Sequence, residues 1–297
     1  MLKHWHGAGQ VVGPIERTQE RQLCGMRPAE AGYWQPHSGT MDFCEPNYEH
    51  SHYVAEFWNT ISSVPILLTG IFGVCLCRWQ RLGHEQMLCY TAVAVVGAGS
   101  IAFHATLMRT GQVADEVPML WSVMILIYAV AHHADDRRRR QGQSTGGSST
   151  LGALRAALFA YAVAATALYC SSGFVVFAVG YGLSVLALVI LAVRAIFTCQ
   201  PATGPKPRQL LACAALAYGG GWLAFWVPAE AFCHHFAILP RLPLHALFHL
   251  TSAAGPHLGL TAFAMARFED EHPTAPPSIF FAGLPAIDRG RAVHKHV

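Results

Sequence analysis

Six long stretches without a charged side chain limit how this chain of 297 residues can fold. They cover residues 57–77, 87–108, 117–134, 156–193, 210–229 and 242–266. A helix of about 20 apolar residues crosses the hydrocarbon core of a bilayer, which is roughly 30 Å thick. The fourth stretch is too long for one crossing, and Ser171, Ser172 and Gly173 provide a break near its middle. The sequence therefore predicts an all-α membrane protein with seven transmembrane helices.

The arginines and lysines are distributed unevenly between the two sides of these predicted helices. Loops after the first, third and fifth helices include Arg78, the arginines at 137–140 and Arg208, whereas the opposite loops carry only Arg109 and Arg241. Because basic loops stay on the cytoplasmic side, we expect a lumenal or extracellular N-terminus and a cytoplasmic C-terminus. The net charge of +3 comes from these basic loop residues and does not indicate a surface for nucleic acid. The expected partner is therefore the lipid bilayer.

Three parts are expected along the chain. Residues 1–41 mix Gly, Pro, Arg and Glu without an apolar run, so we expect a lumenal segment with no cleavable signal peptide. Residues 42–267 form the seven-helix domain. Residues 268–297 are proline-rich and are expected to be a mobile cytoplasmic tail.

Three histidines fall at the lumenal end of the predicted helices. His245 and His249 are one helical turn apart, so both imidazoles can reach one metal ion, and His104 lies near the end of the second helix. Three nitrogen ligands leave the fourth position of Zn²⁺ to water, whose pKa then falls to about 7, as in catalytic zinc sites. The competing interpretation is that His245 and His249 are tolerated polar residues near a helix end.

Two further polar residues lie at the same depth. Ser100 is four residues before His104 and shares its helix face, so its hydroxyl could stabilise a developing oxyanion or only bond its own helix carbonyl. Asp115 is the nearest acid and could accept the proton of the attacking water and pass it to a leaving group. The alternative for Asp115 is an interfacial carboxylate exposed to water.

An acidic stretch precedes the first predicted helix. Asp42, Glu45, Asn47 and Glu56 offer oxygen ligands, which suit Ca²⁺ with its demand for 6–8 oxygens, and a backbone carbonyl such as that of Phe43 would complete the shell. The spacing does not follow the EF-hand pattern. The alternative is an acidic loop in which Glu56 favours the dipole at the helix N-terminus.

Five short motifs, taken together in order and spacing, resemble those of the alkaline ceramidases. They occupy residues 42–48, 54–62, 99–104, 115–119 and 245–249, and the resemblance extends from about residue 33 to residue 267. The histidine motifs also resemble a wider superfamily of membrane hydrolases that includes adiponectin-receptor-like proteins. The resemblance implies a seven-helix intramembrane amidase that cleaves ceramide to a sphingoid base and a free fatty acid.

The resemblance also assigns roles to individual residues. Zinc ligands are implied at His104, His245 and His249, and catalytic roles at Ser100 and Asp115. Calcium ligands are implied at Asp42, Phe43 (through its carbonyl), Glu45, Asn47 and Glu56. Tyr181 resembles a family tyrosine near the substrate. Two positions depart from the family: Phe43 replaces the usual Trp, and the usual acidic residue before Cys233 is absent or displaced to Glu230.

Two of the nine cysteines, Cys44 and Cys233, are placed by the predicted topology at the lumenal face. An oxidising lumen permits a disulfide bond between them, and the family resemblance points the same way. We therefore expect this bond to tie the acidic stretch to the loop before the last helix.

Other functions fit the same predicted fold. The chain could be a lipid-sensing receptor with little or no turnover, or a hydrolase of another membrane lipid, such as a phytoceramide or a glycerolipid ester. The sequence predicts a multi-pass membrane protein, and the resemblance implies the endoplasmic reticulum or Golgi membrane if the host is eukaryotic.

Overall fold

The computed structural model describes residues 32–140, 142, 148–194 and 205–271, and two short strands near the C-terminus. The strands, β1 (Ser278–Ile279) and β2 (Ile287–Asp288), pair antiparallel, with Ser278 opposite Asp288. Residues 1–31 of the expected lumenal segment, and most of the expected tail after 271, lie outside the described residues.

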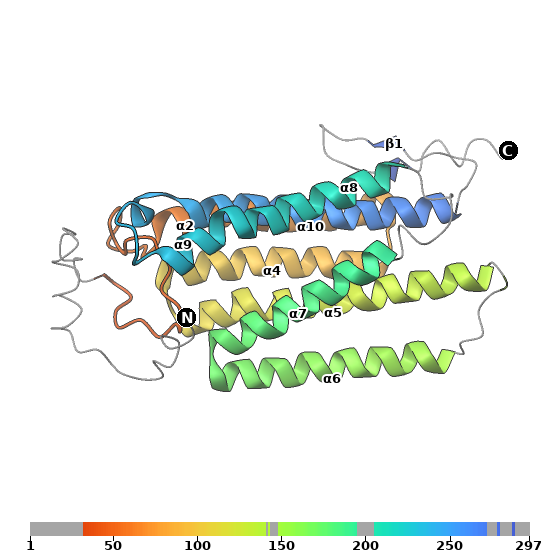
Figure 1. Cartoon of the computed structure of the whole chain (residues 1–297), viewed down its shortest axis with the longest axis horizontal. Helices are drawn as coiled ribbons and strands as arrows, with labels where there is room; N and C mark the ends of the chain where they lie inside the picture. The colour runs from red at the N-terminus through yellow and green to blue at the C-terminus, as the bar shows by residue number, and fades with distance from the viewer. Residues whose placement is uncertain are drawn as a thin grey trace.

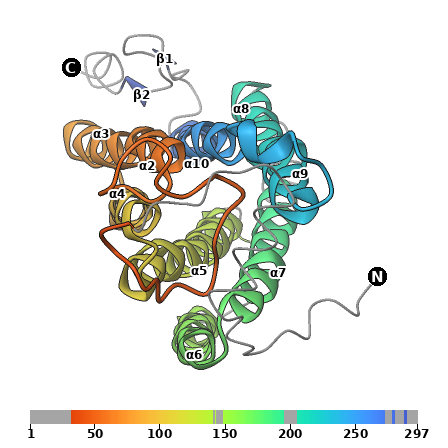
Figure 2. The ribbon, with the colours of Figure 1, turned by 90° about the vertical axis from the view of Figure 1, so that its left-hand side faces the viewer.

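Helices form nearly all of the described structure, as predicted. In chain order they are α2 (Phe57–Ser62), α3 (Val64–Gln80), α4 (His84–Thr106), α5 (Arg109–Arg140), α6 (Ser148–Ser172), α7 (Phe174–Val193), α8 (Pro205–Ala215), the π-helical turns η2 (Leu216–Gly220) and η3 (Trp222–Trp226), α9 (Val227–Phe232), the 3₁₀ turn η4 (Leu239–Arg241) and α10 (Leu244–Glu271). The long helices run side by side (Figure 1). Seen along their axes, α3 and α10 are neighbours, α4 lies beside α3, α5 lies beside α4, and α6 is at the far edge (Figure 2).

The expected break in the longest apolar stretch is present. Helix α6 ends at Ser172 and α7 begins at Phe174. Gly173 between them has a φ of +88°, a conformation that side chains with a Cβ rarely adopt. The glycine therefore lets the chain reverse direction between two crossings.

Six helical segments of the described chain are long and apolar enough to cross a membrane. They are Phe57–Gln80, His84–Thr106, Arg109–Arg140, Ser149–Ser172, Phe174–Val193 and Pro207–Phe232. The seventh predicted crossing, α10, is 28 residues long, about 42 Å at the usual helical rise, but is not among them. Its histidines and its charged last turn lower its hydropathy. It nevertheless packs along α3 and α8 within the bundle.

Close helix packing brings α3, α4 and α5 together. A Cβ added to Gly97 would lie 2.2 Å from the backbone nitrogen of Leu67, and one added to Gly99 would lie 2.3 Å from the carbonyl carbon of Ala114. Backbones can approach this closely only where a side chain is missing. These two glycines therefore allow the close contact of α4 with α3 and with α5.

One end of the bundle collects the start of α2, the end of α4, the start of α5, α9 and the start of α10 (Figures 1 and 2). We call it the histidine end, because His104 and His245 lie there. The opposite end carries Arg78 near the end of α3, the arginines at 137–140 of α5, and Arg267 near the end of α10. Within the described chain, these histidines are thus separated from most of the basic side chains.

Candidate metal centre

His104 at the end of α4 meets His245 and His249 at the start of α10. Their possible ligand atoms all lie within 4.8 Å of one another, and the three side chains form a buried group. The exposed fractions are only 1% for His104, 6% for His245 and 5% for His249. The sequence predicted this convergence, and three buried imidazoles are a donor set that suits a zinc ion.

Two of the imidazoles are held by carboxylates. Nδ1 of His104 is paired with Oε2 of Glu56, which is fully buried. Nδ1 of His245 lies 3.0 Å from Oε1 of Glu230. A carboxylate that accepts the Nδ1 proton fixes the tautomer and ring orientation of a histidine. Nε2 of each ring is therefore the atom left for a metal.

The third imidazole is held by uncharged groups around the junction of α2 and α3. Nδ1 of His249 lies 2.8 Å from the Ser62 hydroxyl, 3.2 Å from the Ser63 hydroxyl and 3.2 Å from the Asn59 carbonyl oxygen. Because the carbonyl can only accept, Nδ1 carries the proton in this arrangement. His249 thus also presents Nε2 to the centre of the site.

Phe43 packs its ring against the metal centre. The ring centroid lies 4.1 Å from that of His245 and 5.1 Å from that of His104. The backbone nitrogen of Phe43 donates to Oε1 of Glu56 at 2.9 Å. The resemblance implied a role for its carbonyl only, whereas the side chain here covers two imidazoles.

Ser100 and Asp115 lie together beside the histidines. The Ser100 side chain is buried, hydrogen-bonds the Asp115 carboxylate and accepts a hydrogen bond from Ser63 Oγ at 3.0 Å. Because Ser63 also contacts His249, it bridges Ser100 and the metal centre. Sequence reasoning missed Ser63, since it lies between two helices and shares no regular spacing with the histidines.

The acidic stretch surrounds a buried amide oxygen. Nδ2 of Asn47 donates to Asp42 at 2.8 Å, while Oδ1 of Asn47 is buried without a hydrogen-bond partner among the described residues. Burial, together with the nearby Asp42 charge, raises the pKa of Glu56 to about 8. An unsatisfied oxygen among mutually repelling carboxylates is an arrangement that a cation would stabilise.

Glu45 has a second role in this stretch. Its carboxylate accepts from the backbone nitrogens of Trp58 at 2.6 Å and Asn59 at 2.9 Å, so it caps the N-terminus of α2. Burial raises the pKa of Glu45, and Glu56 contributes in the same direction. Glu56 is the residue at the N-terminus of α2, where the sequence analysis put it, but its side chain makes no cap bond and pairs with His104.

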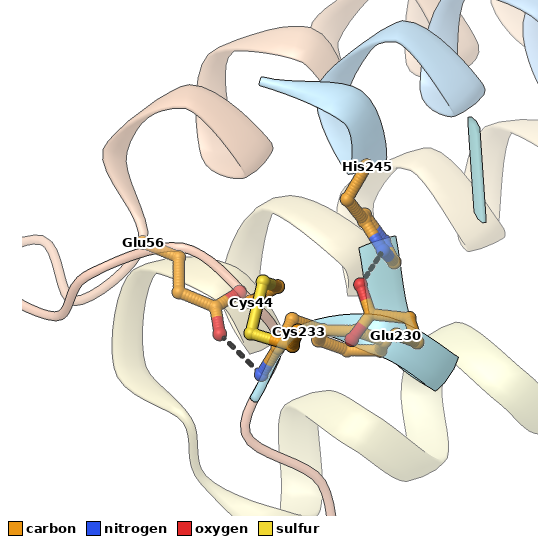
Figure 3. The surroundings of a disulfide bond; sticks show 6 residues. Cys44, Glu56, Glu230, Cys233 and His245 are labelled. Carbon is orange, nitrogen blue, oxygen red and sulfur yellow. Dashed lines mark hydrogen bonds and ion pairs between the residues drawn. A yellow bond between two sulfur atoms is a disulfide. The ribbon is translucent and has the colours of Figure 1, made fainter. Parts of the chain in front are cut away.

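A disulfide bond joins Cys44 to Cys233, with 5.6 Å between the two Cα atoms. It connects the acidic stretch to the end of α9, beside Glu230 and His245 (Figure 3). The two segments are 189 residues apart in the sequence.

Tyr181 on α7 lies farther along the bundle. Its hydroxyl hydrogen-bonds that of Tyr218 in η2 at 2.6 Å, and its ring stacks on Phe177. It is close enough to Asp115 for the two groups to interact electrostatically. Tyr181 therefore faces the same interior as the catalytic candidates without joining the histidine group.

A cavity of about 440 Å³ opens beside the metal centre. Its lining includes Glu45, Trp58, Arg241 and His245. Water can therefore approach His245 from the histidine end of the bundle.

The other histidines of the described chain do not join this group. His257 is buried on α10 and hydrogen-bonds the Tyr90 hydroxyl through Nδ1 at 2.9 Å. His234 and His235 follow Cys233 and are exposed.

The sequence has relatives among known proteins. The family model described as Ceramidase matches residues 35–287. Alkaline ceramidase 3 of Mus musculus is 42% identical over 107 residues, which are 35% of this chain and 40% of the mouse protein. An alkaline ceramidase of Arabidopsis thaliana is 36% identical over 98 residues, covering 33% of this chain and 38% of the plant protein. The chain thus aligns with less than half the length of these two relatives.

A longer alignment is found with dcd3B of Dictyostelium discoideum, which is named as a candidate alkaline ceramidase. It is 25% identical over 254 residues, which are 76% of this chain and 86% of that protein.

Proposed function

We propose that this chain, which belongs to the ceramidase family, hydrolyses the amide bond of ceramide to a sphingoid base and a free fatty acid. The observation that carries the proposal is the convergence of His104, His245 and His249 in a buried group. Such a set fits Zn²⁺, because each ring has its Nδ1 atom bonded elsewhere and its Nε2 atom free for the ion.

When bound, Zn²⁺ would act as a Lewis acid and would lower the pKa of a coordinated water from 15.7 to about 7. The protein's part is to hold the three rings and to compensate the ion's charge. Glu56 and Glu230 are both nine-tenths or more buried, and each contacts a ligand ring. Two carboxylates therefore balance the two positive charges that such a site would hold.

Ser100 and Asp115 are the groups placed to act on the substrate. Asp115 would take a proton from the attacking water as the C–O bond of the tetrahedral intermediate forms, and would then deliver it to the amide nitrogen as the C–N bond breaks. Ser100 would donate its hydroxyl proton to the oxygen of the tetrahedral intermediate. In this structure its hydroxyl accepts from Ser63 and directs its own proton at the Asp115 carboxylate, so this proton would turn to the oxygen of the intermediate when substrate is bound.

The membrane placement supports a lipid substrate. The six candidate spans make this a multi-pass membrane protein. We propose that α10 is a seventh crossing, with the N-terminus on the lumenal or extracellular side and the C-terminus in the cytoplasm. In a eukaryotic host the endoplasmic reticulum or Golgi membrane would be its place, and residues 42–267 would form the catalytic domain.

A calcium ion in the acidic stretch is a separate part of the proposal. The buried, unpartnered Oδ1 of Asn47 and the carboxylates of Asp42, Glu45 and Glu56 support it. Glu45 can still contribute because a carboxylate has about four lone-pair sites and the α2 cap uses two of them. The Phe43 carbonyl is the remaining proposed ligand.

Calcium should stabilise the purified protein. We expect millimolar Ca²⁺ to raise the melting temperature of the wild type, because binding to the folded state shifts the unfolding equilibrium. Asn47→Leu should abolish this rise, whereas Glu49→Gln, at an exposed position of the same loop, should retain it. An unchanged wild-type melting temperature across a calcium titration would count against the site.

A lipid panel tests the proposed activity. Purified full-length protein would be assayed with ceramides, phytoceramides and glycerolipid esters, with and without a zinc chelator. We expect ceramide hydrolysis that is lost with chelator and in His104→Ala, and kept in His234→Ala, which removes an exposed histidine. Folded, zinc-bound protein without turnover would favour a receptor, and preference for esters would favour another lipid hydrolase.

A further inference from the structure

His245 lies between two groups that come from distant parts of the chain. Glu230 of α9 contacts Nδ1 of His245 at 3.0 Å, and the Phe43 ring packs on the same imidazole with 4.1 Å between centroids. The Glu230 and His245 side chains are only 9% and 7% exposed. A carboxylate this buried is costly unless it is paired, and its partner here is a proposed metal ligand.

The disulfide bond joins the two segments that hold His245. Cys44 directly follows Phe43, and Cys233 is three residues after Glu230, about one helical turn away. Figure 3 shows the bond lying beside the Glu230–His245 pair. Helix α9 has only 6 residues, and the loop that follows it is largely exposed, so the bond is a covalent constraint on the position of Glu230.

From this arrangement we infer that Glu230 is a positioning residue of the metal centre, and that the Cys44–Cys233 bond holds it against His245. The inference rests on the proposed metal-dependent function. Glu230 acts through His245: it accepts the Nδ1 proton, keeps Nε2 unprotonated and turned inward, and raises the basicity of the ring as a ligand. Glu56 has the same relation to His104, but it lies twelve residues after Cys44, at the start of α2, whereas Glu230 is only three residues before Cys233.

Zinc affinity in the absence of substrate tests the inference. Full-length protein would be stripped of metal and titrated with Zn²⁺ against a chromophoric chelator. Glu230→Ala should weaken binding by about 10–100-fold, the usual effect of losing such a partner. Glu230→Gln has nearly the same shape and keeps an accepting oxygen without the charge, so its loss should be smaller. Replacing Zn²⁺ by Co²⁺ should give a different visible absorption spectrum in Glu230→Ala.

The role of the disulfide is tested by combining variants. Cys44→Ser with Cys233→Ser should weaken zinc binding in the wild-type background, but should cause little further loss when Glu230 is already Ala. His234→Ala, next to Cys233, is the control and should bind zinc as the wild type does. Additive losses would overturn the connection between the disulfide and Glu230.

Wild-type zinc affinity in both Glu230 variants would overturn the whole inference. That result leaves the proposed function standing if ceramide is still hydrolysed in a zinc-dependent way. Conversely, a wild type that binds zinc and hydrolyses no lipid would refute the proposed function, and the affinity series would still decide the role of Glu230. Because Glu230→Gln changes the shape of the side chain little, the test survives if Glu230→Ala fails to fold.

Discussion

At the scale of single residues, the partners of the three imidazoles determine what the site can hold. Glu56 and Glu230 give two of the rings an anionic partner, whereas His249 has only hydroxyl and carbonyl groups around its Nδ1. A divalent cation would therefore meet neutral ligands backed by two negative charges. The two buried negative charges are compensated when an ion such as Zn²⁺ is bound and are poorly compensated without one.

Asp115→Asn separates proton transfer from metal binding. The amide has nearly the same shape but cannot accept the proton of the attacking water, so ceramide hydrolysis should fall by about 10²-fold or more. Zinc content should be unchanged, because Asp115 is not one of the three grouped ligands. Rates and metal content would be measured on the same preparation. An Asp115→Asn protein that retains wild-type turnover would remove Asp115 from the mechanism.

The residues predicted from sequence were those with a regular spacing or a fixed depth. His245 and His249 share a helix face, and His104 falls at the same end of the bundle. Ser63 and Glu230 were not assigned to the metal centre, because neither has a periodic relation to a histidine in the sequence. Glu230 lies on α9 beside the Cys44–Cys233 bond, and Ser63 lies at the α2–α3 junction, so both contacts with the histidines depend on tertiary structure.

At the scale of helices, the close contact of α4 and α5 aligns the catalytic candidates. Gly99 precedes Ser100, and a Cβ at Gly99 would also lie 2.5 Å from the backbone nitrogen of Asp115. The missing side chain thus allows the Ser100–Asp115 hydrogen bond to form between the helices. The close packing at Gly99 therefore also determines how Ser100 and Asp115 are placed in the site.

Gly99→Ala should damage both stability and activity. The added methyl must push α4 and α5 apart, which costs roughly 1–3 kcal/mol when a well-packed interior is overfilled. A shift of about 1 Å at the site can lower the rate by about 10²-fold. Gly182→Ala on α7 is the matched control, because a Cβ there meets nothing within 4 Å. Equal melting temperatures and rates in the two variants would contradict this account of the α4–α5 contact.

The sequence predicted the helices correctly where the chain is uniformly apolar, but it did not predict where the α-helix gives way to π-helical turns. The break at Gly173 was expected from its neighbours and is present. The π-helical turns η2 and η3 were not expected; they adjoin the run Gly219, Gly220 and Gly221, where the preference for an α-helix is weak. Helix α10 begins within two residues of its predicted start, but its histidines, two of them proposed metal ligands, lower its hydropathy, and it is not among the candidate spans.

At the scale of the whole molecule, the bundle is chemically asymmetric. The proposed metal centre, the disulfide bond and the cavity of about 440 Å³ lie at the histidine end. Most of the described arginines lie toward the other end. An enzyme whose lipid substrate remains in the bilayer would then receive water through this cavity at the histidine end.

Cysteine labelling tests how this asymmetric bundle sits in the membrane. Glu49→Cys places a thiol at an exposed position of the histidine end, and Gly142→Cys places one at an exposed position beyond α5. In intact cells or sealed vesicles of known orientation, a membrane-impermeant reagent should label the first from the lumenal or extracellular side and the second from the cytoplasm. For each variant, the labelling of the wild type, which has cysteines of its own, would be subtracted before the two variants are compared. The reverse pattern would invert the proposed topology.

The geometry of the metal centre can be measured directly by X-ray absorption at the zinc edge on the purified full-length protein. Three histidines and one open position predict one zinc per chain with four nitrogen or oxygen ligands at about 2.0–2.1 Å, and one imidazole fewer in His249→Ala. Sulfur ligands at about 2.3 Å, or full ceramide hydrolysis by protein that contains no metal, would contradict the proposal of a catalytic zinc held by three histidines.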